Sequence, residues 1–162
     1  GVTFEAAKFK SKSAAQAFQE VKNSRQDMFE DAFDHISRSL VTIYKDLTRS
    51  NKYPIGGQAS LNLDNQEDPY NGGIKFTAMP PGKRLRDIDQ LSGGERTIAA
   101  LALLFAIHSY RPAPFFVMDE IDAALDNINV KKVCNFLEEK TKAGVFQGIV
   151  ISLKDMFYER AQ

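Results

Sequence analysis

The chain has 162 residues with 21 basic and 21 acidic side chains, and 43% of its residues are hydrophobic. This length and composition predict one globular domain that buries a core, and they exclude a disordered or collagen-like chain. The balanced charge argues against nucleic-acid binding by bulk electrostatics. The single Cys excludes an intramolecular disulfide, and the longest apolar run, 98–107, is too short to cross a bilayer.

The first predicted element is a long helix. Between residues 14 and 48 apolar side chains recur at steps of three, four and seven, and no Pro or Gly interrupts them. One interpretation is an amphipathic helix of the core, and the other is the root of a coiled coil that leaves the domain. We treat residues 1–50 as this helical unit and residues 51–162 as the domain that follows.

Two short strands are expected next, at 59–63 and 74–79, joined by an acidic loop rich in Asn and Gly. This pattern predicts an antiparallel pair. From residue 85 onward the sequence alternates between helix and strand, which predicts a parallel sheet with helices on its faces. The expected elements are a helix over 94–110, a strand over 115–118, a helix over 128–141, a strand over 145–153 and a short helix from about 154. The strand over 115–118 is continuously apolar, as a strand buried on both faces would be, and we expect the strand over 145–153 to be buried in the same way.

Two acids, Asp119 and Glu120, directly follow the strand expected at 115–118. They would lie at the C-terminal edge of a parallel sheet, where ligands bind in such folds. Adjacent side chains on an extended backbone point in different directions, so one carboxylate can hold Mg²⁺ while the other accepts a proton from water. The alternative is a polar strand end whose acids cap the next helix.

The run Leu91-Ser92-Gly93-Gly94-Glu95 stands at the start of the helix expected over 94–110. Glycines allow close approach of a ligand to the backbone, and a helix start offers unpaired N–H groups. These features predict an anion cradle. The alternative is a plain capping box, in which Ser92 and Glu95 satisfy the first turn of the helix.

Taken together, these motifs resemble those of ATP-binding-cassette ATPases. Residues 91–95 resemble the signature motif, 115–120 the Walker B strand with its two acids, and Asp126 the D-loop. The long leading helix and the run from Asp119 to Asp126 are similar to the structural-maintenance-of-chromosomes (SMC) branch. Residues 99–110, 114–116 and 150–154 are most similar to the SMC subunits of cohesin, and among these to the first. The resemblance covers residues 14–159.

The resemblance implies an α/β fold, namely the C-terminal lobe of an ABC-type ATPase head. Such a lobe has a parallel-sheet core with flanking helices, a small antiparallel strand pair and a leading coiled-coil helix. The phosphate-binding loop (Walker A) belongs to an N-terminal lobe, and this sequence lacks its pattern. Gly82-Lys83 comes nearest, but Thr77 replaces the first Gly and Arg84 replaces the hydroxyl residue. We therefore expect an ATPase half-site that is inactive without the N-terminal lobe and a partner head.

The same resemblance implies roles for individual residues. Asp119 would help to hold Mg²⁺ through water, Glu120 would activate the attacking water, and Asp126 would lie between two heads. The signature residues would contact ATP bound on the opposing head; they are Leu91, Ser92, Gly93, Gly94 and Glu95. Most relatives of this kind carry a His that reaches the γ-phosphate, but here Leu153 occupies that position and cannot donate a hydrogen bond.

The implied partners are the protein's own N-terminal lobe, the second cohesin SMC head, the C-terminal winged-helix domain of a kleisin, and DNA through the assembled complex, with no membrane. The implied function is ATP-driven head engagement in sister chromatid cohesion and chromosome organisation in the nucleus, with links to the cell cycle and DNA repair. Two alternatives stay open: a structural lobe that dimerises without hydrolysis, and the head of another SMC or double-strand-break repair ATPase. The presence of Glu120 weighs against the first, and Leu153 together with the run over 105–110 weighs against the second.

Three other reactive side chains are expected to be structural. His35 and His108 lie on expected helices, where each is expected to be a partly buried or surface residue and not a ligand. Cys134 lies on an amphipathic helix, where it would act as a small core hydrophobe.

Overall fold

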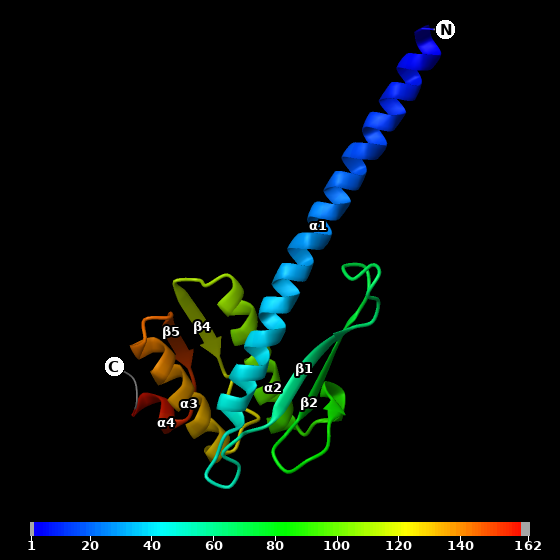
Figure 1. Cartoon of the computed structure of the whole chain (residues 1–162). Helices are drawn as coiled ribbons and strands as arrows, with labels where there is room; N and C mark the ends of the chain where they lie inside the picture. Colours follow the sequence, from blue (N-terminus) through cyan, green and yellow to red (C-terminus); the bar gives the residue numbers. More distant parts are fainter. Residues whose placement is uncertain (1, 160–162) are drawn as a thin grey trace.

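A computed structural model describes residues 2–159 and is dominated by one projecting helix (Figure 1). This helix, α1, spans Val2–Thr48. The elements that follow are β1 (Gln58–Leu63), β2 (Ile74–Met79), β3 (Arg86–Asp87), the 3-10 turn η1 (Ile88–Gln90), α2 (Gly93–Tyr110), β4 (Phe115–Asp119), α3 (Asn127–Lys142), β5 (Gln147–Ile151) and α4 (Asp155–Tyr158). The expected helices and strands are confirmed, most to within a few residues at each end. Sequence patterning misses β3 and η1, because elements of two or three residues are too short to show a period.

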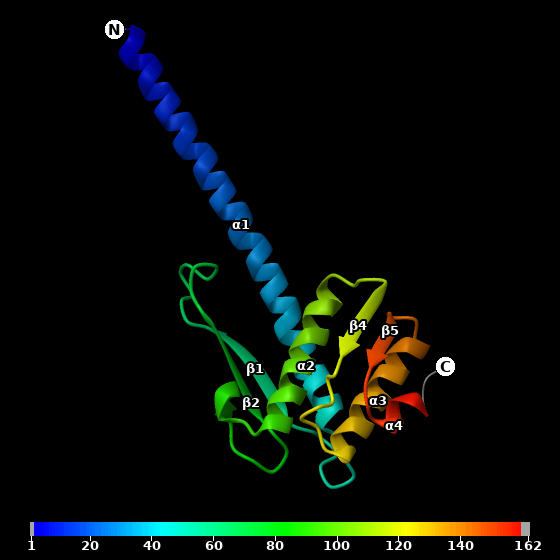
Figure 2. The same cartoon turned by 180° about the vertical axis from the view of Figure 1, so that it is seen from behind.

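Helix α1 consists of a projecting part and a packed part. Its N-terminal residues stand clear of the rest of the molecule in both views (Figures 1 and 2), and Phe18 and Val21 are 71% and 69% exposed. Leu40, Tyr44 and Leu47 are fully buried instead. A core helix over the whole stretch is therefore wrong, because within the described residues the fully buried side chains of α1 are confined to its last turns. We call the part before residue 36 the arm.

The arm is held where it leaves the domain. The guanidinium of Arg25 lies over the ring of Tyr70 in the β1–β2 loop, 4.2 Å from its centroid. On another side, the hydroxyl of Tyr110 at the end of α2 donates to the carboxylate of Asp31 at 3.1 Å, and this hydrogen bond raises the pKa of Tyr110. Within residues 2–159, no helix is both long enough and apolar enough to cross a membrane.

Two separate sheets flank the packed part of α1. In one, β1 and β2 pair antiparallel as predicted, with Ala59 opposite Ala78, and β3 adds a short third strand. In the other, β4 and β5 pair in parallel, also as predicted, with Phe115 opposite Gln147 and Asp119 opposite Ile151. Figure 2 shows β4 and β5 side by side next to α2 and α3.

The β4–β5 sheet is covered on one face only, so the expectation that both strands are buried on both faces is wrong. Phe116 and Met118 point toward the helices, and the ring of Phe116 lies 5.8 Å from that of Phe105 in α2. The opposite face, which we call the outer face, remains about half exposed. It consists of Phe115 (55%), Val117 (54%), Ile149 (46%) and Ile151 (52%). In the part of the chain that the structure describes, both α2 and α3 pack on the inner face.

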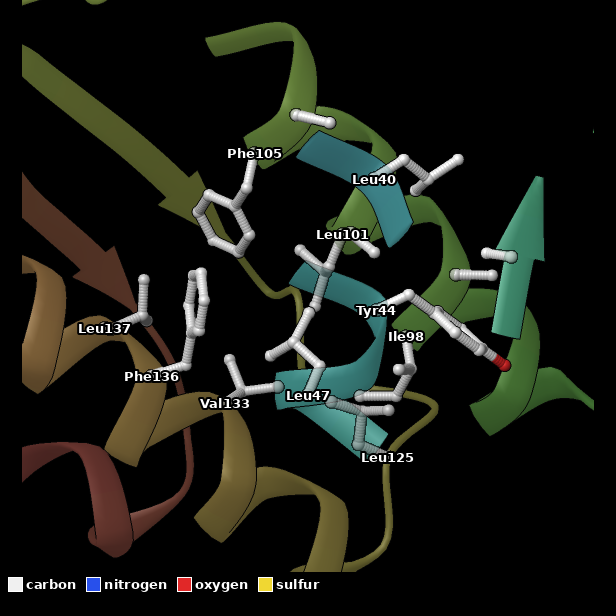
Figure 3. Packing of buried hydrophobic residues seen from close by; sticks show 14 of the residues in the cluster. Leu40, Tyr44, Leu47, Ile98, Leu101, Phe105, Leu125, Val133, Phe136 and Leu137 are labelled. Carbon is white, nitrogen blue, oxygen red and sulfur yellow. The ribbon is translucent and has the colours of Figure 1, made fainter. Parts of the chain in front are cut away.

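The core joins three helices that are far apart in sequence (Figure 3). Leu40, Tyr44 and Leu47 recur at the four- and three-residue steps that align side chains on one face of a helix. They meet residues of α2 and α3 in one buried cluster. Phe105 and Phe136 pack against each other within it, with their rings tilted by 44° and ring centroids 5.0 Å apart.

The side chains expected to be structural have structural partners. His35 Nε2 lies 3.1 Å from the hydroxyl of Ser109, which ties α1 to α2. His108 Nε2 lies 3.2 Å from the carbonyl oxygen of Ala113, in the turn before β4. Cys134 is 4% exposed in the core, as predicted.

Replacing one side chain in the packed part of α1 and one in the arm by Ala should have different effects on stability. We expect Leu47→Ala to lower the free energy of unfolding by about 2–5 kcal/mol, since it empties a fully buried site. Phe18→Ala, on the exposed arm, should change it by less than about 0.5 kcal/mol. Urea unfolding of both variants measures the difference, and similar losses at the two positions would contradict the division of the helix.

Candidate functional site

Asp119 and Glu120 lie at the C-terminal edge of the parallel sheet, as predicted. Asp119 is the last residue of β4, and Glu120 follows it with a φ of 47°, in the left-handed region. This conformation costs a non-glycine residue about 1–2 kcal/mol. It is fixed by a hydrogen bond from the Glu120 N–H to the carbonyl of Ile151 (2.9 Å). The bend breaks the alternation of the strand, and both carboxylates remain exposed to solvent.

Seven residues, 120–126, lead from β4 to α3, and we call them the link segment. Two turn hydrogen bonds shape it, from Ala123 N–H to the carbonyl of Glu120 (3.2 Å) and from Leu125 N–H to that of Asp122 (3.0 Å). Its last residue, Asp126, caps α3 by accepting a hydrogen bond from the N–H of Asn129 (2.8 Å). The alternative in which Asp119 and Glu120 cap the next helix is therefore wrong, because Asp126 fills that role.

The signature segment, residues 91–95, forms the start of α2. Leu91 is buried and anchors it. Ser92 and Glu95 form the capping box, in which the Ser92 N–H donates to Glu95 Oε2 at 3.1 Å. The Ser92 hydroxyl donates to the same oxygen at 2.8 Å, and Lys83 Nζ lies 2.7 Å from Glu95 Oε1. Partial burial disfavours the charged form of Glu95, but the hydrogen bonds from Lys83 and Ser92 outweigh it and lower the pKa of this carboxyl.

The two glycines of the signature segment have different surroundings. A Cβ built on Gly94 would lie 3.2 Å from the carbonyl oxygen of Ala124, so this glycine allows α2 to lie close to the link segment. A Cβ on Gly93 would meet no atom of the described chain within 4 Å. Packing within this chain therefore gives no reason for a glycine at position 93.

The structure brings the signature segment and the link segment together. Besides the approach of Gly94 to Ala124, Glu95 and Asp126 line one cavity of about 490 Å³, together with Tyr44. Burial and the charge of Glu95 raise the pKa of Tyr44 to about 12. Glu120 is bound to β5 instead, through Ile151. The predicted residues thus form two groups, one at the sheet edge and one at the start of α2, connected by the link segment.

Sequence reasoning missed three polar residues, one within the link segment and two that contact it. Asp122 and Ser152 are each 3% exposed, and the Ser152 hydroxyl donates to Asp122 Oδ2 at 2.9 Å. Lys154 Nζ donates to the carbonyl of Leu125 at 2.5 Å. A polar residue inside an apolar run, as in Ile121-Asp122-Ala123, is the only local signal for this arrangement. Leu153, which lies between Ser152 and Lys154, is 88% exposed.

A complete metal site does not exist among the described residues, which contain no group of three His, Cys, Asp or Glu side chains able to hold a metal ion. Asp119 nevertheless fits Mg²⁺, because this ion is bound through one or two carboxylates, keeps several waters and takes its other ligands from substrate phosphates. An exposed carboxylate at a sheet edge meets that requirement.

Residues 3–162 match the sequence profile described as the RecF/RecN/SMC N terminal domain. The chain is 56% identical to structural maintenance of chromosomes protein 1 of Arabidopsis thaliana, over 88% of this chain and 13% of that protein. Among solved structures it is similar to the Smc head domain with an extended coiled coil from Pyrococcus furiosus, bound to the C-terminal domain of ScpA. That match has a TM-score of 0.79 and 39% identity over 93% of this chain and 36% of the other.

A second similar structure is described as the structural biochemistry of ATP-driven dimerization and DNA stimulated activation of SMC ATPases. It matches with a TM-score of 0.73 and 40% identity, over 84% of this chain and 78% of the other. The α/β fold with its leading helix is thus that of SMC head domains. The chain spans only 13% of the length of its Arabidopsis relative.

Removing the ammonium at position 83 should change the titration of Glu95. We expect Lys83→Met to raise the Glu95 pKa toward its ordinary value, because the 2.7 Å contact favours the ionised carboxylate. A carboxyl with a lowered folded-state pKa stabilises the fold above its unfolded pKa, and this contribution is lost as the pH falls through the folded value. The variant should therefore lose less stability on acidification. NMR titration of the Glu95 side chain measures the shift, and Lys75→Met, which breaks the exposed pair with Asp87, is the control. An unchanged Glu95 titration would contradict the assignment.

Proposed function

Because this chain belongs to the RecF/RecN/SMC family, we propose that it is the C-terminal half of an SMC ATPase head, of the type found in the first SMC subunit of cohesin. The order of the signature segment, the β4 acids and the link segment supports this proposal, as does the similarity to an SMC protein 1. The chain covers a small part of that relative, so the activity would belong to a larger protein.

The observation that carries the proposal is the outer face of the β4–β5 sheet. Its four apolar side chains lie on neighbouring strands, where Val117 is directly opposite Ile149, Phe115 is opposite Gln147 and Ile151 is opposite Asp119. Parallel sheets are normally covered on both faces, and a contiguous apolar patch marks a contact surface. We propose that the N-terminal lobe with the phosphate-binding loop covers this face. The nucleotide phosphates would then lie at the sheet edge beside Asp119 and Glu120, and this half alone would not hydrolyse ATP.

The two acids would divide the chemistry. Asp119 would hold Mg²⁺ through water, and the bound ion would offset the negative charge of the phosphates. Glu120 would accept a proton from the water that attacks the γ-phosphate. Its left-handed backbone supports this role, since strain of this kind is retained where the side chain must be aimed in a particular direction. A non-hydrolysing structural lobe would have no need for it.

The signature segment would act on ATP bound to a partner head. The start of α2 offers backbone N–H groups, and the open space beside Gly93 leaves room for a phosphate. Both donors of Ser92 are directed at Glu95, so a phosphate contact would require its hydroxyl to exchange one acceptor for another. Asp126 would face the partner from the end of the link segment. Leu153 would supply no hydrogen bond to the phosphate, and the mechanism would proceed without a His at that position.

The relatives suggest partners for the whole protein. The exposed apolar residues of the arm would pair with the other strand of an antiparallel coiled coil. One similar head binds the C-terminal domain of ScpA, and another belongs to work on ATP-driven dimerization, so we propose a kleisin winged-helix domain and a second cohesin SMC head as partners. The setting would be sister chromatid cohesion on nuclear chromosomes, with DNA bound by the assembled complex.

Replacing the proposed base tests the function. In the complete head with its partner, Glu120→Gln should lower ATP turnover by about 10²–10⁴-fold while ATP binding persists, because the amide keeps the shape of the carboxylate but cannot accept the proton. Steady-state hydrolysis and equilibrium ATP binding measure the two properties. Glu67→Gln, in the exposed β1–β2 loop, is the matched control and should hydrolyse normally. Normal turnover in Glu120→Gln would show that another group is the base.

A second substitution separates the phosphate cradle from a plain helix cap. If Ser92 only caps α2, Ser92→Arg should cost about 0.5–2 kcal/mol of stability and reduce head association no more than folding. We expect a larger effect: association with the partner head and hydrolysis should be lost, while the fold and ATP binding at the head's own site persist, since Arg would fill the space beside Gly93. Thermal melting, ATP affinity and ATP-dependent association are measured on the same variant. A variant that melts lower but associates normally would leave the cap as the whole explanation.

A further inference from the structure

The chain that leaves β5 contacts the link segment at three successive points. The carbonyl of Ile151 accepts from Glu120 N–H (2.9 Å), Ser152 Oγ donates to Asp122 Oδ2 (2.9 Å), and Lys154 Nζ donates to the carbonyl of Leu125 (2.5 Å). These contacts are distributed along the link segment from its first residue to its penultimate one. We call Asp122, Ser152 and Lys154 the latch.

The two buried residues of the latch, Asp122 and Ser152, are connected to each other and to their neighbours by hydrogen bonds. Asp122 and Ser152 are both 3% exposed, and a buried carboxylate is costly unless a donor reaches it. Ser152 Oγ accepts a hydrogen bond from the N–H of Lys154 (3.0 Å), and its own hydroxyl proton is donated to Asp122. The hydroxyl of Tyr158 in α4 donates to the carbonyl of Ser152 and fixes the same residue from the other side.

The alternation of an extended backbone explains why Leu153 takes no part. Lys154 has extended dihedral angles (φ −97°, ψ 126°), and side chains on such a backbone alternate between two sides. Ser152 and Lys154 both reach the link segment, whereas Leu153 is 88% exposed. The stretch 152–154, which has Leu153 where most relatives have a His, therefore contacts the link segment through Ser152 and Lys154.

We propose that Asp122, Ser152 and Lys154 are positioning residues that fix the link segment, and with it Glu120 at one end and Asp126 at the other, for ATP hydrolysis between two heads. This inference rests on the proposed function. Both of the chemically important ends of the link segment are exposed: Glu120 is held by its bond to Ile151 and Asp126 by its cap on α3, and the residues between them depend on the latch. The latch supplies the fixed geometry, and a misplacement of about 1 Å can cost about 10²-fold in rate.

The test uses the full-length SMC protein with its partner head and three substitutions of lysine. Lys154→Met keeps the stem and removes the ammonium, Lys154→Arg keeps a cation that can reach the Leu125 carbonyl, and Lys142→Met removes an exposed ammonium elsewhere, at the end of α3. Ser152→Ala tests the buried half of the latch. We expect Lys154→Met and Ser152→Ala to lower kcat about 10–10²-fold at unchanged KM for ATP, and to speed hydrogen exchange of the Ala123 and Leu125 amides. Lys154→Arg should restore most of the turnover, and Lys142→Met should change neither property.

Unchanged exchange of these amides would overturn the latch, and so would faster exchange with unchanged kcat. A KM that rises together with a fall in kcat would also overturn it, since that pattern indicates general loss of structure. If Ser152→Ala fails to fold, the more accessible Lys154→Met decides the question. Normal turnover in Glu120→Gln would refute the proposed function instead, and the exchange of the link-segment amides would still show whether the latch holds them.

Discussion

The packing of the last turns of α1 against α2 and α3 is the interaction on which the remaining structure depends. Leu40, Tyr44 and Leu47 are fully buried there, and each contributes to one cluster with residues more than 50 positions later in the sequence (Figure 3). The same turns reach the first sheet, because Thr48 Oγ1 accepts the N–H of Gly57 at 2.7 Å just before β1. Lys132 Nζ of α3 donates to the Thr48 carbonyl at 3.3 Å. The end of a single helix thus sets the relative positions of both sheets and of the helices that carry the candidate site.

That packing also determines what the site can do. Helix α2 is fixed in the core by its buried residues, and its exposed first turn presents the signature segment. The capping box and the proposed phosphate contact are compatible, because a cap leaves the other N–H groups of the first turn unsatisfied. Glu95 belongs to the cap, to an ion pair with Lys83 and to the electrostatic surroundings of Tyr44. The charge of Glu95 therefore affects both the exposed Lys83 and the pKa of the buried Tyr44.

The uncovered outer face and the strained Glu120 are consequences of the same architecture. Both helices of the second sheet lie on its inner face, so the hydrophobic effect within this chain stabilises the sheet from one side only. The outer apolar side chains would become buried if another segment or chain covered this face. Glu120, at the edge of that face, is held by a backbone hydrogen bond to β5 and is not supported by packing of its side chain. Association and catalysis would thus meet at one edge of the sheet.

The sequence by itself determined the features that depend on near neighbours. Helical spacing, apolar runs and turn residues predicted α1 to α4, the antiparallel pair and the parallel pair. The order of motifs predicted the candidate roles of Asp119, Glu120, Asp126 and the segment 91–95. Tertiary structure alone decided which apolar residues are buried: Phe18 and Leu47 follow the same helical period, yet Leu47 is fully buried and Phe18 is 71% exposed. An apolar strand likewise has the same sequence whether its second face is covered by its own chain or by another. The left-handed Glu120 and the bond between Asp122 and Ser152, 30 residues apart, are also tertiary, because a hydrogen bond across that distance leaves no periodic trace in the sequence.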